Sequence, residues 1–350
     1  MTAPDRVMPP GGREGVASDH QPGLAPGRLI RLMTEAIGRC QLDLAGRTVL
    51  AEAASGAYVV TPVLAALAGA RVYALAAPTA YATGQELQAA TAELAGLAGV
   101  ADRVHLVREK SAEVIGAADI VTNSGQVRPI DAAMTAQMKP SAVVTLMYES
   151  WEYRRSDVDL DACRARGIRV AGVNEDHPAV DFFAFLGPMA IKQLQDAGIS
   201  VYRSRIVLLC DNSFGPFIAK SLRNCGADVV EERRLTPAAL SPACDAVLLA
   251  LRPISGAVLT AEDARVLGER APGTVLVQYW GDVDRASLAA AWVPVWPPES
   301  PRAGHMAVLP SAIGPEPVVR LQSGGLKVGE LMARGLEHVT PQERTFVQPL

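Results

Sequence analysis

Apolar residues form two kinds of pattern along this chain, short continuous runs and stretches with helical spacing. The two kinds alternate from about residue 29 to residue 336. Short apolar runs such as Ile206–Leu209 are typical of strands buried on both faces of a parallel sheet. Stretches such as Leu29–Cys40 carry their apolar residues at helical spacing. Alternating strands and helices predict an α/β fold with parallel sheets. We expect two Rossmann-like domains with an interdomain cleft.

The pattern places each element by residue number. Strands are expected at residues 47–51, 71–75, 104–107, 119–123, 142–147, 168–173, 206–209, 227–231, 245–251 and 274–279. Helices are expected at residues 29–40, 61–68, 85–99, 130–138, 157–166, 178–195, 215–225, 260–270 and 318–336, although Gly324 and Gly325 weaken the last. Residues 294–317 are predicted to be mostly loop. The design of strand, turn, helix and strand therefore occurs twice, near 47–75 and near 205–231.

Domain limits follow from composition and from one long helix. Residues 1–27 are rich in proline and glycine without apolar periodicity, which predicts a disordered arm. Residues 28–187 are expected to form an N-terminal Rossmann-like substrate domain, with 318–350 as a candidate completion. Residues 188–317 would form a dinucleotide-binding domain. The helix at 178–195 is long enough to carry the chain from one domain to the other.

Composition sets limits on partners and compartment. The chain has 350 residues, of which 49% are apolar, so large cores can form. A net charge of −4 gives no indication of a basic surface that would bind nucleic acid or an anionic membrane. No apolar run approaches the ~20 residues that span a bilayer, and we expect a cytoplasmic protein. The five cysteines are scattered, so we expect reduced core thiols and no metal site.

The stretch Arg205–Arg234 is the best nucleotide-binding candidate. It is predicted to be a strand, a tight turn, a helix and a second strand. Such a turn presents helix N–H groups where a dinucleotide pyrophosphate would bind. The candidate contacts are Asp211, Asn212, Ser213, Phe214 and Gly215 in the turn, together with Arg233 after the second strand.

From about Asp119 to residue 315, the order of features resembles the D-isomer-specific 2-hydroxyacid dehydrogenases, the formate and glycerate dehydrogenase-like superfamily. The matching passages are Asp159 through Gly167-Ile168-Arg169-Val170, the helix 179–194, Cys225-Gly226-Ala227-Asp228-Val229, Leu251-Arg252-Pro253 and Pro272–Val277. The resemblance implies NAD or NADP as cofactor, a small-molecule substrate and a homodimer. It also implies cofactor contacts from Arg252, Pro253, Tyr279, Trp280 and Gly281.

The sequence departs from the family pattern where that family does its chemistry. Its three turn glycines fall on Cys210, Asn212 and Gly215, and the second normally lets the backbone approach the pyrophosphate. Trp280 occupies the position of the family's catalytic arginine, so the positive charge that would bind a substrate carboxylate is missing. Ser311 follows Pro310 where a catalytic histidine is expected. The chain is therefore a divergent member by this resemblance.

Two groups of residues are candidates for proton transfer. His305 with Glu299 suits acid–base chemistry near neutrality, and the alternative is a loop histidine that caps a carbonyl. Glu149 and Glu152 follow a buried strand, where ligands collect in open α/β sheets, and Trp151 lies between them. The alternative is a solvated loop whose glutamates pair with Arg154 and Arg155.

Other strand ends offer substrate contacts. Asn123, Ser124 and Gly125 resemble the family turn whose backbone N–H groups hold a substrate carboxylate, although the same residues suit any tight turn. The turn from Glu52 to Tyr58 also fits the start of an S-adenosylmethionine methyltransferase fold. The next strand ends without the carboxylate that such a fold needs, so Tyr58 is alternatively a substrate contact in the cleft.

Three functions remain open from the sequence. The first is an NAD(P)-dependent oxidoreductase acting on a small 2-hydroxy, 2-oxo or amino acid. The basic residue Arg233 near the position that selects the cofactor favours NADP slightly. The second is a redox-inactive, dehydrogenase-like protein that binds a metabolite or performs lyase-type chemistry. The third is the methyltransferase.

Overall fold

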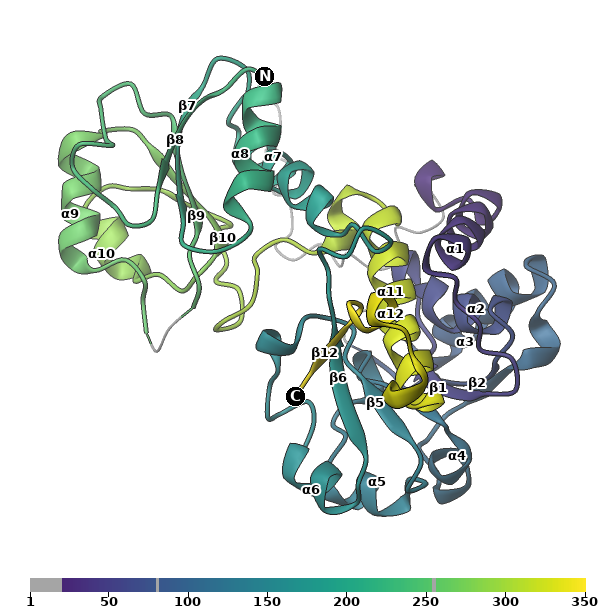
Figure 1. The fold of residues 1–350 in the computed structure, drawn as a ribbon. Coiled ribbons are helices and arrows are strands. Elements are labelled where there is room, and N and C mark those ends of the chain that lie inside the picture. The colour runs from purple at the N-terminus through teal and green to yellow at the C-terminus, as the bar shows by residue number, and fades with distance from the viewer. Residues whose placement is uncertain (1–20, 80–81, 254–255) are drawn as a thin grey trace, which may run out of the picture. The chain divides into compact units, whose positions relative to one another are not determined.

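The computed structural model describes residues 21–79, 82–253 and 256–350. These residues form two compact units (Figure 1). Unit 1 comprises the described residues up to Val180 together with Gly314–Leu350, and unit 2 comprises Asp181–Ile313. Both contain parallel sheets flanked by helices, so the predicted pair of Rossmann-like domains is confirmed. The cleft between them stays a prediction.

Part of the predicted disordered arm is ordered. Residues 1–20 lie outside the described residues. Pro22–Leu24 form a 3-10 helix, and α1 (Pro26–Cys40) starts directly after it. Proline suits this start because the first turn of a helix needs no N–H donor. Leu29, Leu32 and Met33 of α1 are buried.

Unit 1 contains a seven-stranded sheet among the described residues, in the order β12-β6-β5-β4-β1-β2-β3. The strands are β1 (Thr48–Glu52), β2 (Arg71–Leu75), β3 (Val104–Val107), β4 (Ile120–Thr122), β5 (Val143–Thr145), β6 (Arg169–Val173) and β12 (Val347–Pro349). All pairings are parallel except that of β12 with β6. The order reverses between β1 and β4, which is where ligands bind in open α/β sheets.

Helices cover both faces of this sheet. They are α1, α2 (Val60–Leu67), α3 (Gly84–Leu97), α4 (Ala112–Ala117), α5 (Ala132–Gln137), α6 (Leu160–Ala165), α11 (Glu316–Arg334) and α12 (Pro341–Arg344). Helices α4, α5 and α6 share one apolar core with the sheet, through Ile115, Met134 and Cys163. Helix α11 packs on β4, β5 and β6 and against α1 and α2 (Figure 1).

The glycines that weaken the prediction for α11 explain its position. A Cβ at Gly325 would lie 2.6 Å from Sδ of Met147, and one at Gly329 would lie 2.6 Å from Cγ2 of Ile120. The glycines therefore let the helix backbone approach the sheet more closely than a side chain would allow. Close approach compensates for the low helix propensity of glycine.

Within its described residues, unit 2 contains a five-stranded parallel sheet in the order β11-β10-β9-β7-β8. Its strands are β7 (Arg205–Cys210), β8 (Asp228–Glu232), β9 (Ala246–Ala250), β10 (Val275–Trp280) and β11 (Val295–Trp296). Its helices are α7 (Leu186–Asp196), α8 (Gly215–Asn224), α9 (Ala261–Arg270) and α10 (Arg285–Ala290). Side chains of α9 and α10 share an apolar core with the sheet. Helices α7 and α8 pack on each other, and each contacts the sheet.

The long helix predicted at 178–195 is shorter than expected. Helix α7 begins only at Leu186, directly after the 3-10 helix Phe183–Phe185, and Asp181 before them has a left-handed φ of 53° that no α-helix can include. The structure also contains the short elements α4, α10, α12, β11 and β12, which the sequence pattern did not predict. No helix in the described ranges is long and apolar enough to cross a bilayer.

Candidate functional site

The predicted nucleotide turn of unit 2 is closed by its own side chains. Asn212 Nδ2 donates to the carbonyl oxygen of Ala250 over 2.8 Å, which joins the end of β7 to the end of β9. Asp211 Oδ1 accepts from the Arg252 backbone N–H over 3.0 Å. The strand order reverses between β7 and β9, so these bonds cross the crevice in which a dinucleotide would lie.

Two of the backbone donors at the start of α8 are also used. The Phe214 N–H donates to Asn212 Oδ1 over 3.0 Å, and the Gly215 N–H bonds to the Cys210 thiol. Pro216 follows and has no N–H to offer. A helix N-terminus binds phosphate through such N–H groups, so these two donors and the N–H that Pro216 lacks are lost to a pyrophosphate.

Aromatic packing fills the space beside the turn. The Phe214 ring stacks on Trp280 with ring centroids 5.4 Å apart, and it contacts Phe183 edge-on at 5.3 Å. Trp280 is buried, and its indole N–H donates to the Gly304 carbonyl oxygen over 3.2 Å. The position of the family's catalytic arginine is therefore part of an apolar core.

The remaining predicted cofactor contacts lie at the same edge of unit 2. Tyr279 is fully buried, and its hydroxyl donates to the Leu186 carbonyl oxygen. Gly281 takes a positive φ of 103° at the end of β10. Pro253 approaches Gly304, whereas Arg233 is exposed after β8. The structure thus brings most of these residues together around packed protein.

His305 and Glu299 do not form a pair. Within the part of the chain that the structure describes, no hydrogen bond or ion pair joins them. His305 Nδ1 lies 3.1 Å from the Ala303 carbonyl oxygen, which is the capping arrangement expected as the alternative. Glu299 is exposed, and Arg285 holds its loop by donating to the carbonyl oxygens of residues 297–299.

A second candidate site lies at the carboxyl edge of the unit 1 sheet. Four neighbouring parallel strands each end in or just before buried polar residues. These are Glu52 at the end of β1, Asn123 and Ser124 after β4, Glu149 after β5 and Glu175 after β6. Because parallel strands end at one edge, their side chains gather around the point where the strand order reverses.

Glu52 fills the turn that was expected to hold a substrate carboxylate. A Cβ at Gly125 would overlap Oε2 of Glu52, so the carboxylate lies directly against this glycine. The Gln126 backbone N–H bonds to the same carboxylate. Burial raises the pKa of Glu52 to about 6, although the charge of Arg128 and this N–H act in the opposite direction.

Asn123 and Ser124 complete this part of the edge. Asn123 Oδ1 accepts the Met147 backbone N–H over 2.8 Å. Its Nδ2 is buried and has no hydrogen-bond partner among the described residues, and the residue as a whole is only 2% exposed. Ser124 Oγ lies 2.7 Å from Thr122 Oγ1. The edge therefore holds one buried donor that could serve a ligand.

Glu149, Glu152 and Glu175 form an electrostatically linked group. Glu149 accepts from Trp151 Nε1 and from Gln348 Nε2. Burial raises the pKa of Glu152 to about 7, opposed by Arg154 and reinforced by Glu149. Burial also raises the pKa of Glu175 well above its usual range, and the charges of Glu152 and Glu149 reinforce this. Protonated carboxylic acids thus persist here near neutral pH.

The cations near this edge have other partners as well. Arg154 lies 3.7 Å from Glu152 and 3.8 Å from Asp157. Arg128 pairs with the same aspartate over 2.9 Å. Arg155, which the alternative interpretation of this loop paired with the glutamates, pairs with Asp161 at the surface. Arg128 and Arg154 thus both interact with Asp157, and Arg154 divides its charge between Asp157 and Glu152.

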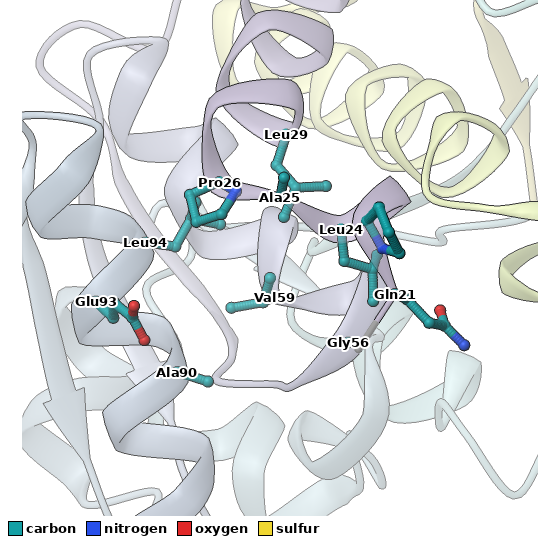
Figure 2. Close-up of a pocket in the computed structure, with 11 residues that line it drawn as sticks. Gln21, Leu24, Ala25, Pro26, Leu29, Gly56, Val59, Ala90, Glu93 and Leu94 are labelled. Carbon is teal, nitrogen blue, oxygen red and sulfur yellow. The ribbon is translucent and has the colours of Figure 1, made fainter. Parts of the chain in front are cut away.

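A cavity of about 650 Å³ opens elsewhere in unit 1 (Figure 2). It lies between the start of α1, the 3-10 turn Gly56–Val59 and α3. Leu24, Leu29, Val59 and Leu94 give it apolar walls, and Glu93 lies on its α3 side (Figure 2). Tyr58 belongs to the same 3-10 turn. Nothing in the structure tests the methyltransferase hypothesis or a substrate contact from Tyr58, so both stay predictions.

No group of three potential metal ligands occurs in residues 21–79, 82–253 and 256–350. The five cysteines are not paired in disulfides, and Cys40, Cys163 and Cys244 are buried. Burial raises the pKa of each of these three thiols. Inert core thiols are the consequence.

No family model and no curated protein matches the sequence. Solved structures do match. A dipicolinate synthase chain from Bacillus halodurans is 12% identical with a TM-score of 0.53, covering 80% of this chain and 96% of its own. The corresponding dipicolinate synthase chain from Bacillus subtilis is 11% identical with a TM-score of 0.53, covering 85% and 100%. The NAD-dependent formate dehydrogenase from Staphylococcus aureus, in complex with NAD, is 12% identical with a TM-score of 0.49, covering 86% and 98%.

At 11% and 12% identity, the two dipicolinate synthase chains show that this chain shares their fold and nothing beyond the fold. The low identities mark a divergent chain. Nothing in these comparisons supports the slight preference for NADP inferred from Arg233. Fold alone does not determine function, so the chemistry must be argued from the residues of the site.

The sequence left two residues of the unit 1 edge without a direct role. Glu52 was noted only in the methyltransferase motif, and Glu175 only as part of the strand-end cluster 174–177, without a contact of its own to a ligand. Both are acidic residues at or just after the end of an apolar strand. That position was the available signal, because strand ends collect ligands in open α/β sheets.

Proposed function

We propose that this protein binds a small polar metabolite at the carboxyl edge of the unit 1 sheet and transfers a proton there without redox chemistry. The observation that carries the proposal is a group of three carboxyls, the buried Glu149 and Glu175 and the half-buried Glu152, in which desolvation and mutual repulsion raise the pKa values of Glu152 and Glu175. Acids that titrate near neutrality suit general acid–base catalysis. Addition or elimination is the corresponding reaction class.

The closed turn of unit 2 supports this choice over hydride transfer. A dinucleotide would have to displace Asn212 from the Ala250 carbonyl oxygen and then bind a helix start that includes Pro216. The buried Trp280 provides no charge for a substrate carboxylate. His305 has no carboxylate partner among the described residues.

An NAD-dependent oxidoreductase acting on a small molecule is the second candidate. The observation that favours it is the fold, which NAD-dependent dehydrogenases share and which brings the predicted cofactor residues of unit 2 to one edge. In this case Asn212 would leave the Ala250 carbonyl oxygen when the nucleotide binds.

One titration separates the two candidates. NADH and NADPH would be added to the protein while the fluorescence of its four tryptophans is followed, since Trp280 lies beside the turn. We expect no saturable change up to millimolar nucleotide. Saturable binding of either nucleotide would overturn the non-redox proposal and favour the oxidoreductase.

A thermal-shift screen against small metabolites tests the positive half of the proposal. Any compound that stabilises the protein should lose most of this effect in Glu152→Gln, which keeps the shape of the side chain and removes its titration. His305→Ala is the matched control and should respond like the natural protein. Equal responses from Glu152→Gln and the natural protein would contradict the assignment.

A further inference from the structure

We infer that Glu52 determines the substrate class at the unit 1 edge, so that the site takes a small amine carrying a hydroxyl or carbonyl oxygen and excludes carboxylates. The inference rests on the proposed function, because it concerns the same edge of the sheet. It replaces the carboxylate substrate expected from the sequence.

The turn after β4 already holds a carboxylate that belongs to the chain. Gly125 has a positive φ of 33°, and Oε2 of Glu52 takes the space that a Cβ would need. The Gln126 N–H bonds to the carboxylate, while the Gln126 side chain accepts the Ala77 N–H over 3.1 Å and ties the turn to the end of β2. A ligand carboxylate would therefore have to displace Glu52.

The topology of the sheet places Glu52 beside the crevice in which a ligand would lie. Glu52 ends β1 and Asn123 follows β4, the two adjacent strands between which the order reverses. A ligand in this crevice therefore meets a carboxylate on one strand. An ammonium group complements that charge, whereas a second carboxylate would be repelled.

An independent observation indicates that the ligand also carries an acceptor oxygen. The Nδ2 group of Asn123 is buried without a hydrogen-bond partner among the residues described. An unpaired buried donor is costly, and an acceptor oxygen of a ligand would satisfy it. Because Asn123 lies in the row of strand ends between Glu52 and Glu149, one small molecule that carries an amine and a neutral oxygen fits both demands.

Two probes and three variants test the inference. The probes are ethanolamine, which has an amine and a hydroxyl, and glycolate, which has a carboxylate and a hydroxyl. Binding would be measured by calorimetry on the full chain. We expect the natural protein to bind ethanolamine and not glycolate. In Glu52→Ala, ethanolamine should bind roughly tenfold or more weakly, because a charge-assisted hydrogen bond is lost. The same variant should gain glycolate binding, because the Gln126 N–H becomes available.

Glu52→Gln and Glu93→Ala are the comparison variants. Glu52→Gln keeps an oxygen in the turn, so it should lose ethanolamine without gaining glycolate, and this holds even if Glu52→Ala fails to fold. Glu93 is an exposed residue of α3, and its alanine variant should behave like the natural protein. Glycolate binding by the natural protein, or ethanolamine binding unchanged in Glu52→Gln, would overturn the inference. If these results hold while Glu152→Gln leaves all ligand responses intact, the proposed function fails and the specificity role of Glu52 stands.

Discussion

Replacing Glu52 by glutamine should change how the stability of the protein depends on pH. Burial raises the pKa of Glu52 from 4.5 to about 6 in the folded protein. The folded state therefore holds this proton more tightly than the unfolded state does. The contribution of Glu52 to the free energy of unfolding is fully present below about pH 4.5. It is lost as the pH rises through 6, because burial penalises the charged form of the carboxyl group.

The size of the effect follows from the pKa shift. A shift of about 1.5 units corresponds to about 2 kcal/mol, at roughly 1.4 kcal/mol for each unit. Glutamine cannot titrate, so Glu52→Gln lacks this loss. The free energy of unfolding of the variant minus that of the natural protein should rise by about 2 kcal/mol between pH 4 and pH 8. Other titrating groups cancel in this difference.

Urea unfolding of both proteins across this pH range measures the difference directly. Any change in hydrogen bonding adds an offset that does not vary with pH. Glu93→Gln, on the exposed surface of α3, should give a flat difference. A flat or falling difference for Glu52→Gln would refute the reasoning, since it would mean that Arg128 and the Gln126 N–H outweigh the effect of burial.

Three further variants test the fold and the closed turn. Asn212→Ala removes the bonds to the Ala250 carbonyl oxygen and the Phe214 N–H, and should lower the free energy of unfolding by about 1–3 kcal/mol in urea titrations. Gly329→Val should lower the midpoint of thermal unfolding, because its side chain overlaps the sheet and overpacking costs about 1–3 kcal/mol. Lys327→Met leaves Glu330 buried without its 2.8 Å partner and should cost about 3–5 kcal/mol by the same urea assay, whereas adding Glu330→Leu should restore most of it.

Most of the fold could be predicted from the sequence because burial imposes a period on the apolar residues. Strands such as β2 and β3 occur at the predicted residues, since they are short apolar runs between turn residues. Helix α7 was predicted to start too early, because periodicity does not report a single left-handed residue such as Asp181. Strand β12 was missed because three residues that pair with one edge strand carry little pattern.

The candidate site was only partly predictable, for a different reason. The rule that ligands collect at strand ends led to Asn123, Glu149 and Glu152, which the structure shows to be buried or partly buried polar residues. The rule could not pair Glu52 with Gly125, because their contact depends on β1 lying beside β4, and strand order is not written in local sequence. In the same way, the bond from Asn212 to Ala250 depends on the adjacency of β7 and β9.

The two sheet edges differ in whether their buried polar groups find partners within the protein, and this difference is the reason for proposing the site at the unit 1 edge. At the unit 2 edge, Asp211 and Asn212 bond to neighbouring backbone groups, so little is left to attract a ligand. At the unit 1 edge, buried carboxyls repel one another, and Nδ2 of Asn123 lacks a hydrogen-bond partner within the described ranges. Such an arrangement is unfavourable for folding alone. A ligand that supplied a positive charge and an acceptor would relieve it, which is the physical reason to expect the reaction at this edge.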